Sequence, residues 1–362
     1  MRELLIDIFW ISIVTISVAL NFHLLGLLFT YHTRHSTLDG TGTRCKVGHV
    51  TPDRKPVVHS ALDLDGLPHF TGALSHVILE VDGALDTGTD DEVEKIKTMF
   101  AYWEKYPPCL LASHPTSWTF SQTTLTMLLR SSPVSTKMKE LRDLFNNLPT
   151  TVRACFKSFE IRHAGLAAPG HGNRTLEADR SQSRSLFSAL LSNGIKLENP
   201  NHALYINADC VPVQPNWLNL VDYRTRPPNE PYWMMGSIFR GQRGEWAKNL
   251  ASFIHLSRYA LYNLADSDFR EWYLRAVKRY AEDHPVPLYD FGRWEMDIFH
   301  YLADLAVSID FQTTAAKFRY TNTILNQWNV TVDVPAILTK DPDVAMVCGI
   351  VPKLTRDIPH GV

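Results

Sequence analysis

Short apolar runs alternate along this chain with stretches that carry apolar side chains at helical spacing. Short apolar runs between polar breaks are typical of buried strands, whereas apolar residues at every third or fourth position indicate amphipathic helices. We expect strands at residues 75–81, 109–112, 156–161 and 203–206. We expect helices at residues 89–103, 125–129, 138–148 and 176–192. This order predicts an α/β fold in which helices flank a sheet.

The second half of the chain contains two further predicted helices and a predicted strand. Asp268 and Glu271 stand at the spacing of a capping box, and the apolar residues after them lie on one helix face as far as Tyr280. Residues 289–299 open a further helix, and residues 318–326 resemble a closing strand.

The N-terminal region carries an apolar run, residues 8–29, without Asp, Glu, Lys or Arg. Such a run is long enough for the hydrocarbon core of a bilayer, which needs about 20 residues. A cleaved signal peptide is an alternative, with Ser17 and Ala19 at cleavage spacing, and a buried core helix is another. We favour a transmembrane signal anchor, because the run continues well past those two residues.

Two signals disagree about the orientation of this anchor. Arg34, Arg44 and Lys46 follow the apolar run, and the positive-inside rule would place them in the cytoplasm. Two N-x-T sequons, which begin at Asn173 and Asn329, instead indicate a C-terminal body in the secretory pathway.

The segment after the anchor is polar and contains Gly, Thr, His and Pro, as linkers do. We therefore divide the chain into an anchor at residues 1–30, a stem at 31–67 and a globular domain at 68–362.

Composition excludes some classes of function. The formal net charge is −2, and there is no basic stripe with interleaved aromatic residues, so nucleic-acid binding is not expected. The 5 cysteines lie far apart without a C-x-x-C pair, which argues against a structural zinc site. An odd number leaves at least one thiol free if the others form disulfides.

The triplet Asn207-Ala208-Asp209 follows the predicted strand at residues 203–206 and precedes a turn that contains prolines. Ligands of open α/β sheets collect at the carboxyl ends of strands. A carboxylate there, with a second oxygen ligand two residues away, can hold a divalent cation that neutralises a diphosphate. The plain alternative is a strand end at which Asp209 caps a backbone N–H group.

This stretch resembles the metal-binding segment of GT-A glycosyltransferases, which use nucleotide-sugar donors. The family pattern is approximately Tyr-(Met/Ile)-(Glu/Asp)-x-Asp-x-x-Pro-(Ile/Val)-x-Pro-x-Trp-Leu. The residues that fit it are Tyr205, Asp209, Pro212, Val213, Pro215, Trp217 and Leu218. Asn207 departs from the pattern, because an amide offers a metal an oxygen without a charge. The resemblance implies Mn²⁺ or Mg²⁺ held mainly by Asp209, in a weakened site.

A second segment, residues 231–241, resembles Phe-Trp-x-x-Gly-Ser-x-(Tyr/Phe)-Arg-Gly of the same family. Gly236 permits close approach of the backbone, Ser237 offers a hydroxyl, and Arg240 can bind a phosphate or a sugar carboxylate. The resemblance implies that these residues, together with Asn207, bind the nucleotide-sugar. A tight turn with a solvent-facing arginine is the plain alternative.

A third segment, residues 254–263, resembles His-Ile-Asn-Gly-Asn-Ala-(Leu/Ile)-Tyr-Asn. His255 fits this pattern and is a further candidate contact of the nucleotide-sugar. Ser257-Arg258-Tyr259 replaces the central Asn-Gly-Asn, so Arg258 stands where the pattern has a glycine that would lie near the donor sugar.

Three acids near the next predicted helix are candidates for the general base that activates an acceptor hydroxyl, namely Asp290, Glu295 and Asp297. Each is equally explained as a helix cap or a solvated charge. Asp82 follows the first predicted strand and is a candidate nucleotide contact or a plain turn residue. His360 is a remote candidate for a further metal ligand.

The resemblance covers roughly residues 75–330 and implies a GT-A (Rossmann-like) mixed sheet flanked by helices, with an N-terminal transmembrane helix. It implies a metal-assisted glycosyltransferase that moves a sugar from a nucleotide-sugar donor to a glycan or glycoprotein acceptor. It also favours a single-pass type II protein of the Golgi or endoplasmic reticulum membrane, with a lumenal body. The alternatives are a catalytically inactive relative that binds a glycan or a protein partner, and an unrelated membrane-tethered α/β protein.

Overall fold

The computed structural model describes residues 73–81, 91–109, 122–132, 135–166, 176–226, 231–238, 240, 255–284, 294–305, 310–327 and 332–349. The expected anchor and stem therefore lie outside the described residues, as do the candidates Asp82, Asp290 and His360. Among the described helices, none is long and apolar enough to cross a membrane.

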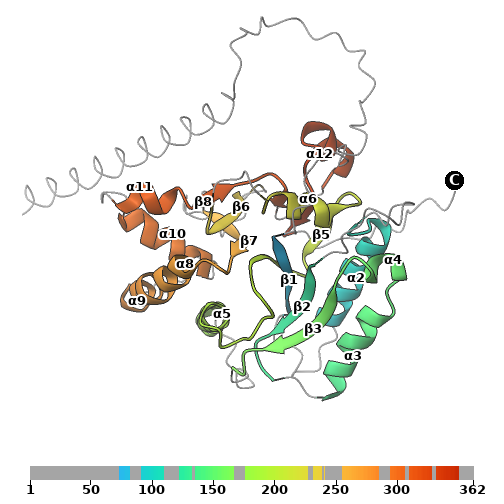
Figure 1. The fold of residues 1–362 in the computed structure, drawn as a ribbon, viewed down its shortest axis with the longest axis horizontal. Coiled ribbons are helices and arrows are strands. Elements are labelled where there is room, and N and C mark those ends of the chain that lie inside the picture. The colour runs from blue at the N-terminus through green and yellow to red at the C-terminus, as the bar shows by residue number, and fades with distance from the viewer. Residues whose placement is uncertain are drawn as a thin grey trace, which may run out of the picture. The chain divides into compact units, whose positions relative to one another are not determined.

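A seven-stranded mixed sheet forms the centre of the domain, in the strand order β3-β2-β1-β4-β7-β6-β8 (Figure 1). Its strands are β1 (Leu74–Val81), β2 (Thr124–Leu129), β3 (Ser158–His163), β4 (His202–Asn207), β6 (Met234–Ile238), β7 (Leu256–Asn263) and β8 (Phe318–Tyr320). The strands β3, β2, β1 and β4 are parallel, and β7 runs antiparallel to both β4 and β6. The expected mixed sheet flanked by helices is confirmed.

The prediction of a helix at residues 125–129 was wrong, because this segment is the strand β2. All six residues of β2 are buried between β1 and β3, with Leu125 and Leu129 in one hydrophobic cluster and Leu128 in the other. A short run that is apolar on both faces has no periodicity that distinguishes a strand from a helix. The predicted strand at 109–112 is not seen at Cys109, and its other residues lie outside the described chain.

Helices cover both faces of the sheet (Figure 1). One face packs against α2 (Asp91–Lys105), α3 (Ser135–Asn146), α4 (Thr150–Arg153) and α6 (Trp217–Tyr223). The other packs against α5 (Leu176–Leu191), α8 (Ser267–Trp272), the π-helical segment η3 (Tyr273–Val277) and α10 (Trp294–Leu305). The remaining described helices are α9 (Lys278–Asp283), α11 (Asp310–Ala315) and α12 (Val334–Lys340).

The predicted helix faces explain this packing. Trp103 of α2 is fully buried, and its ring centroid lies 5.1 Å from that of Trp217 of α6. On the opposite face, Phe187 of α5 stacks on Trp294 of α10 at 4.7 Å. The cap of α8 is not Asp268, as predicted, but Asp266, whose carboxylate accepts a hydrogen bond from the N–H of Phe269.

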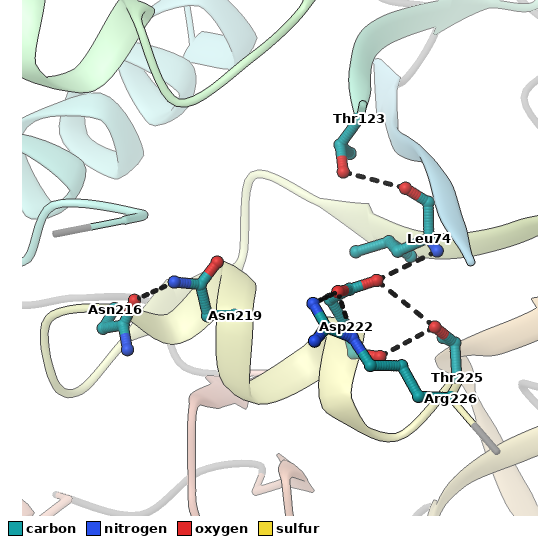
Figure 2. A network of polar contacts seen from close by, with 7 residues as sticks. All are labelled: Leu74, Thr123, Asn216, Asn219, Asp222, Thr225 and Arg226. Atoms are coloured by element: carbon teal, nitrogen blue, oxygen red, sulfur yellow. Dashed lines mark hydrogen bonds and ion pairs between the residues drawn. The ribbon is translucent and has the colours of Figure 1, made fainter. Parts of the chain in front are cut away.

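A buried carboxylate joins α6 to the amino-terminal end of β1. Figure 2 shows Asp222 accepting hydrogen bonds from the N–H of Leu74, at 3.1 Å, and from the hydroxyl of Thr225. Arg226 forms an ion pair with the same carboxylate. The Thr123 hydroxyl donates to the Leu74 carbonyl at 2.8 Å, which adds the start of β2 to the network. This network holds the edge of the sheet opposite the carboxyl ends of the parallel strands.

A second sheet has three strands in the order β5-β10-β9. It comprises β5 (Cys210–Pro212), which follows β4 in the sequence, together with β9 (Ile324–Asn326) and β10 (Met346–Cys348). Residues 318–326 therefore contribute two strands to two sheets rather than one closing strand. Cys210 and Cys348 pair as direct neighbours in the β5–β10 register and form a disulfide. A second disulfide joins Cys109 to Cys155.

Candidate functional site

The strand order places a switch point between β1 and β4. From β1 the chain proceeds to β2 and then β3 on one side, whereas β4 lies on the other side of β1. In open α/β sheets, the crevice at such a point, outside the carboxyl ends of the strands, is where ligands bind. Asn207 is the last residue of β4 and lies opposite Glu80 of β1 in the register. The polar triplet therefore lies at the position where this topology favours a ligand.

Asn207 and Asp209 form a closed hydrogen-bonded pair. The Asn207 Oδ1 atom accepts a bond from the backbone N–H of Asp209 at 3.0 Å, and its Nδ2 atom donates to the Asp209 Oδ2 atom at 3.0 Å. A reversed amide would set its NH₂ group against an N–H group and its oxygen against a carboxylate, so both partners determine its orientation. Asn207 is 3% exposed, which leaves it little room to turn outward.

This pair does not fit a divalent metal site. Hard cations favour several oxygen ligands, usually with more than one negative charge. Here one Asp209 oxygen already accepts an amide hydrogen bond, and the Asn207 oxygen accepts another. Within the described residues, no group of three or more His, Cys, Asp or Glu side chains is placed to hold a metal ion. The expectation that Asp209 binds Mn²⁺ or Mg²⁺ stays a prediction.

The small sheet links the turn at Asp209 to the segment that carries Arg240. The N–H of Gly349 donates to the Asp209 carbonyl at 3.1 Å, directly after the disulfide-bonded Cys348. Asn326 of β9 lies opposite Cys348, and the N–H of Arg240 donates to the Asn326 carbonyl at 2.7 Å. Segments that are far apart in the sequence thus meet at the carboxyl end of β4.

Arg240 is exposed and borders a cavity. Its guanidinium donates to Asn322 Oδ1 at 2.9 Å and lies 5.3 Å from the centroid of the Tyr320 ring. The cavity, of about 700 Å³, is also lined by Leu325, Gln327, Ile337 and Lys340. An exposed arginine beside a cavity can receive an anionic group, as expected for this residue.

Gly236 and Ser237, the two candidates that precede Arg240 in the sequence, are buried in the sheet. A Cβ atom on Gly236 would lie 2.9 Å from the Cβ of Ala260, so the glycine allows β6 and β7 to approach each other. Ser237 is fully buried, and its hydroxyl makes no hydrogen bond within the described part of the chain. The predicted roles of Gly236 and Ser237 in binding the nucleotide-sugar stay predictions.

His255 lies at the start of β7 and contacts α10. Its ring centroid is 6.3 Å from that of Phe299. The histidine is half-buried, and this ring contact sets it against α10, the helix that carries Glu295 and Asp297.

Buried charges that were not predicted lie on neighbouring strands at this edge. Glu80 of β1 is fully buried and pairs with Arg130, directly after β2, at 3.1 Å. Arg258 of β7 is 9% exposed, and its guanidinium donates to the Tyr259 hydroxyl at 2.7 Å. A charged residue inside or directly after an otherwise apolar strand is the sequence signal that would have identified them.

The acids of α10 have different environments. Asp297 accepts two hydrogen bonds from Arg184 of α5, both at 2.5 Å. Burial raises the pKa of Asp297 to about 6, although the bonds to Arg184 act in the opposite direction. Glu295 is 8% exposed, and its Oε2 atom is buried without a hydrogen-bond partner among the described residues. Asp297 is therefore engaged in holding two helices together, whereas the buried Oε2 atom of Glu295 is not engaged by the described residues.

Tyr262 of β7 links α10 to the buried charges. Its hydroxyl accepts a hydrogen bond from Trp294 Nε1 at 3.2 Å and donates to the Arg258 carbonyl at 3.0 Å. Burial raises the pKa of Tyr262 well above its usual value, so the hydroxyl remains protonated. The charges of Glu295, Arg258 and Glu80 lie close enough to act on this pKa. These side chains therefore form one cluster beneath α10.

No protein-family model and no curated protein matches the sequence. Among solved structures, the chain is similar to the galactosyltransferase LgtC in complex with donor and acceptor sugar analogs, with 12% identity and a TM-score of 0.41 over 76% of this chain and 87% of that one. It is also similar to mouse xyloside xylosyltransferase 1 in its apo form, with 9% identity and a TM-score of 0.44 over 76% of this chain and 97% of that one. Likeness at this level assigns neither a family nor an activity.

Proposed function

We propose that this protein is a glycosyltransferase of GT-A type that transfers a sugar from a nucleotide-sugar to an acceptor hydroxyl. The observation that carries the proposal is the position of Asn207 and Asp209 at the switch point between β1 and β4. Three ordered segments that resemble this family support it, because the fold gathers parts of all three around the end of β4. The nucleotide-sugar and a glycan or glycoprotein acceptor are the proposed binding partners.

In this proposal, Glu295 is the general base. It would take the proton from the acceptor hydroxyl while that oxygen forms a bond to the anomeric carbon of the donor sugar. The bond from this carbon to the phosphate oxygen breaks, and the nucleotide leaves with the electron pair. The leaving phosphate carries developing negative charge, and we propose that Arg240, exposed at the border of its cavity, stabilises it.

We place the protein in the lumen of the Golgi or endoplasmic reticulum as a single-pass type II membrane protein. The disulfides Cys109–Cys155 and Cys210–Cys348 support this location, because disulfides persist in oxidising compartments and are rare in the cytosol. The anchor and its orientation remain part of the proposal.

A second candidate is an inactive relative that binds a glycan or a protein partner. The hydrogen-bonded Asn207–Asp209 pair favours it, since this pair engages the Asn207 oxygen and one of the two Asp209 oxygens that a catalytic metal would need. The two candidates differ in whether a sugar is transferred, which a binding measurement alone does not decide.

The first experiment is a thermal-shift panel on the full chain, purified in mild detergent, with UDP, GDP, CMP and their sugars, with and without Mn²⁺. Ligand at a hundredfold excess over its Kd stabilises the folded state by about 2.7 kcal/mol, which such a panel detects. We expect one nucleotide class to raise the melting temperature. The shift should be lost in Asp209→Ala. It should be kept in Asp268→Ala, a matched control at an exposed residue of α8.

Transfer is then assayed with the nucleotide-sugar that binds, by release of the free nucleotide in the presence of glycan acceptors. Release in the wild type and loss in Glu295→Gln would support the enzyme. Binding without release under any acceptor would favour the inactive relative. A flat panel on well-folded protein would contradict the glycosyltransferase and favour the relative that binds a glycan or a protein partner.

A further inference from the structure

We propose that this site binds its nucleoside diphosphate without a divalent cation, and that Asn207 and Arg258 together supply what the cation would supply. The inference rests on the proposed function and concerns the same site. Asn207 and Arg258 are the residues at which the sequence departs from the pattern that implies a metal. They belong to the adjacent strands β4 and β7, at the edge of the sheet where β4 ends and β7 begins.

The register between β4 and β7 would bring these residues together. The last paired residues are Tyr205 and Ala260, and the two strands are antiparallel. Continued by two further steps along each strand, this register would set Asn207 opposite Arg258 on the same face of the sheet. The pairing of β7 with β6 shifts register between Ala260 and Leu256, so this juxtaposition is part of the inference. Tyr205 and Ala260 belong to the hydrophobic cluster beneath α10, which identifies that face.

The Asn207 amide donates a hydrogen bond to the Asp209 carboxylate, which in the resembled pattern would instead bind a metal. An acid at this position would set a second carboxylate about 3.0 Å from Asp209 Oδ2, and such a pair needs a shared proton or a cation between its members. The amide instead donates a hydrogen bond at this distance. Asp209 is thus fixed in position by hydrogen bonds without a bound ion.

Arg258 adds the charge that the cation would carry. Relative to the resembled pattern, an amide for an acid and an arginine for a glycine each raise the local charge by one unit, which together equal the charge of Mn²⁺. Guanidinium groups suit phosphate oxygens, because they present several donors in a fixed plane.

The Arg258 guanidinium is held in place before any ligand arrives. It donates to the Tyr259 hydroxyl and lies 4.8 Å from the centroid of that ring. The Arg258 carbonyl accepts a hydrogen bond from Tyr262, which is itself held by Trp294 of α10. A cation fixed in this way near the start of β7 is suited to an incoming diphosphate, because little has to be reorganised when the anion binds.

The test is calorimetric titration of the full chain with UDP and GDP, in EDTA and in Mn²⁺. We expect the wild type to bind one of them with a Kd that differs by less than about twofold between the two conditions. Loss of the electron paramagnetic resonance signal of free Mn²⁺ reports metal uptake directly. We expect no uptake by the wild type, either alone or with the nucleotide.

Variants test the two residues themselves. Arg258→Met should weaken nucleotide binding by about tenfold or more, Arg258→Lys by less, and the exposed control Arg275→Met should have no effect. The double variant Asn207→Asp with Arg258→Gly should take up Mn²⁺ and bind the nucleotide only in its presence. Should the Arg258 variants not fold, the wild-type measurements in EDTA and Mn²⁺ still decide whether nucleotide binding requires a divalent cation.

The outcomes separate this inference from the proposed function. Binding of UDP or GDP that requires Mn²⁺ in the wild type would overturn the inference and leave the glycosyltransferase proposal standing. Unchanged binding in Arg258→Met would overturn the role of the arginine. Binding of CMP alone would overturn the inference, because no diphosphate is involved. No binding of any nucleotide in either condition would overturn both.

Discussion

Cys210 and Cys348 form a disulfide that joins the residue after Asp209 to the end of the strand β10. The next residue, Gly349, donates its N–H to the Asp209 carbonyl at 3.1 Å. Residues 138 positions apart in the sequence thus hold the turn that contains Asp209. The candidate site therefore depends on a covalent link to the C-terminal part of the domain.

Cys348→Ser should lower both stability and ligand binding. Removal of a native disulfide costs about 2–5 kcal/mol in unfolding free energy, and the turn at Asp209 loses its tether. Urea unfolding gives the stability, and the nucleotide titration gives the binding. Cys155→Ser is the matched control, because it breaks the other disulfide and should lower stability while leaving binding nearly unchanged. Equal losses of binding in both variants would contradict this role of Cys210–Cys348.

Glu295→Gln should reduce sugar transfer while nucleotide binding stays within about twofold of the wild type. A positioned general base contributes roughly 10²–10⁴-fold to the rate, and the amide cannot accept the proton. The exposed Glu271→Gln variant is the control for the loss of a charge. Full activity in Glu295→Gln would mean that another group, such as Asp290, takes the proton.

Asp297 should make the stability of the domain depend on pH. Its pKa is raised from 3.8 to about 6 by burial, so ionisation is less favourable in the folded state than in the unfolded state. Its contribution to the unfolding free energy is complete below pH 3.8 and is lost as the pH rises through 6. This shift corresponds to about 3 kcal/mol at most. Asp297→Asn should therefore gain stability relative to the wild type as the pH rises through this range.

The comparison with a variant is needed because His202 has the opposite effect. Burial lowers its pKa from 6.5 to about 4, so its contribution to stability is lost as the pH falls through that interval. The two slopes partly cancel in the wild type. Urea unfolding of the wild type and Asp297→Asn at several pH values between about 4 and 7 isolates the acid. A difference in unfolding free energy that is constant with pH would contradict the assignment.

Gly236→Ala should destabilise the sheet by about 1–3 kcal/mol, because the added Cβ would lie 2.9 Å from the Cβ of Ala260. Adding Ala260→Gly should recover part of this loss, since it removes the atom in contact. Thermal unfolding of the single and double variants measures the coupling. If Gly236→Ala instead kept its stability and lost nucleotide binding, the glycine would serve the ligand rather than the packing of β6 on β7.

The sequence by itself determined the alternation of strands and helices, the polar triplet at the end of β4 and the helix that carries Glu295. Periodicity is a local property, so it identifies elements such as α2, α3 and α5 whose apolar faces are long enough to read. It failed for β2, where both faces of a short segment are buried. It also left the cysteine pairing open, because pairing depends on residues that are distant in the chain.

Only the tertiary structure decided which side chains meet. The β4–β7 register pairs Tyr205 with Ala260, and the packing of α10 on α5 engages Asp297 while leaving the Glu295 Oε2 atom without a partner in the described contacts. In the sequence these acids are equivalent, since both lie in the first turn of one helix. The physical reason is that a hydrogen bond or ion pair depends on distances between elements, which are determined by the packing of two hydrophobic clusters and not by local pattern.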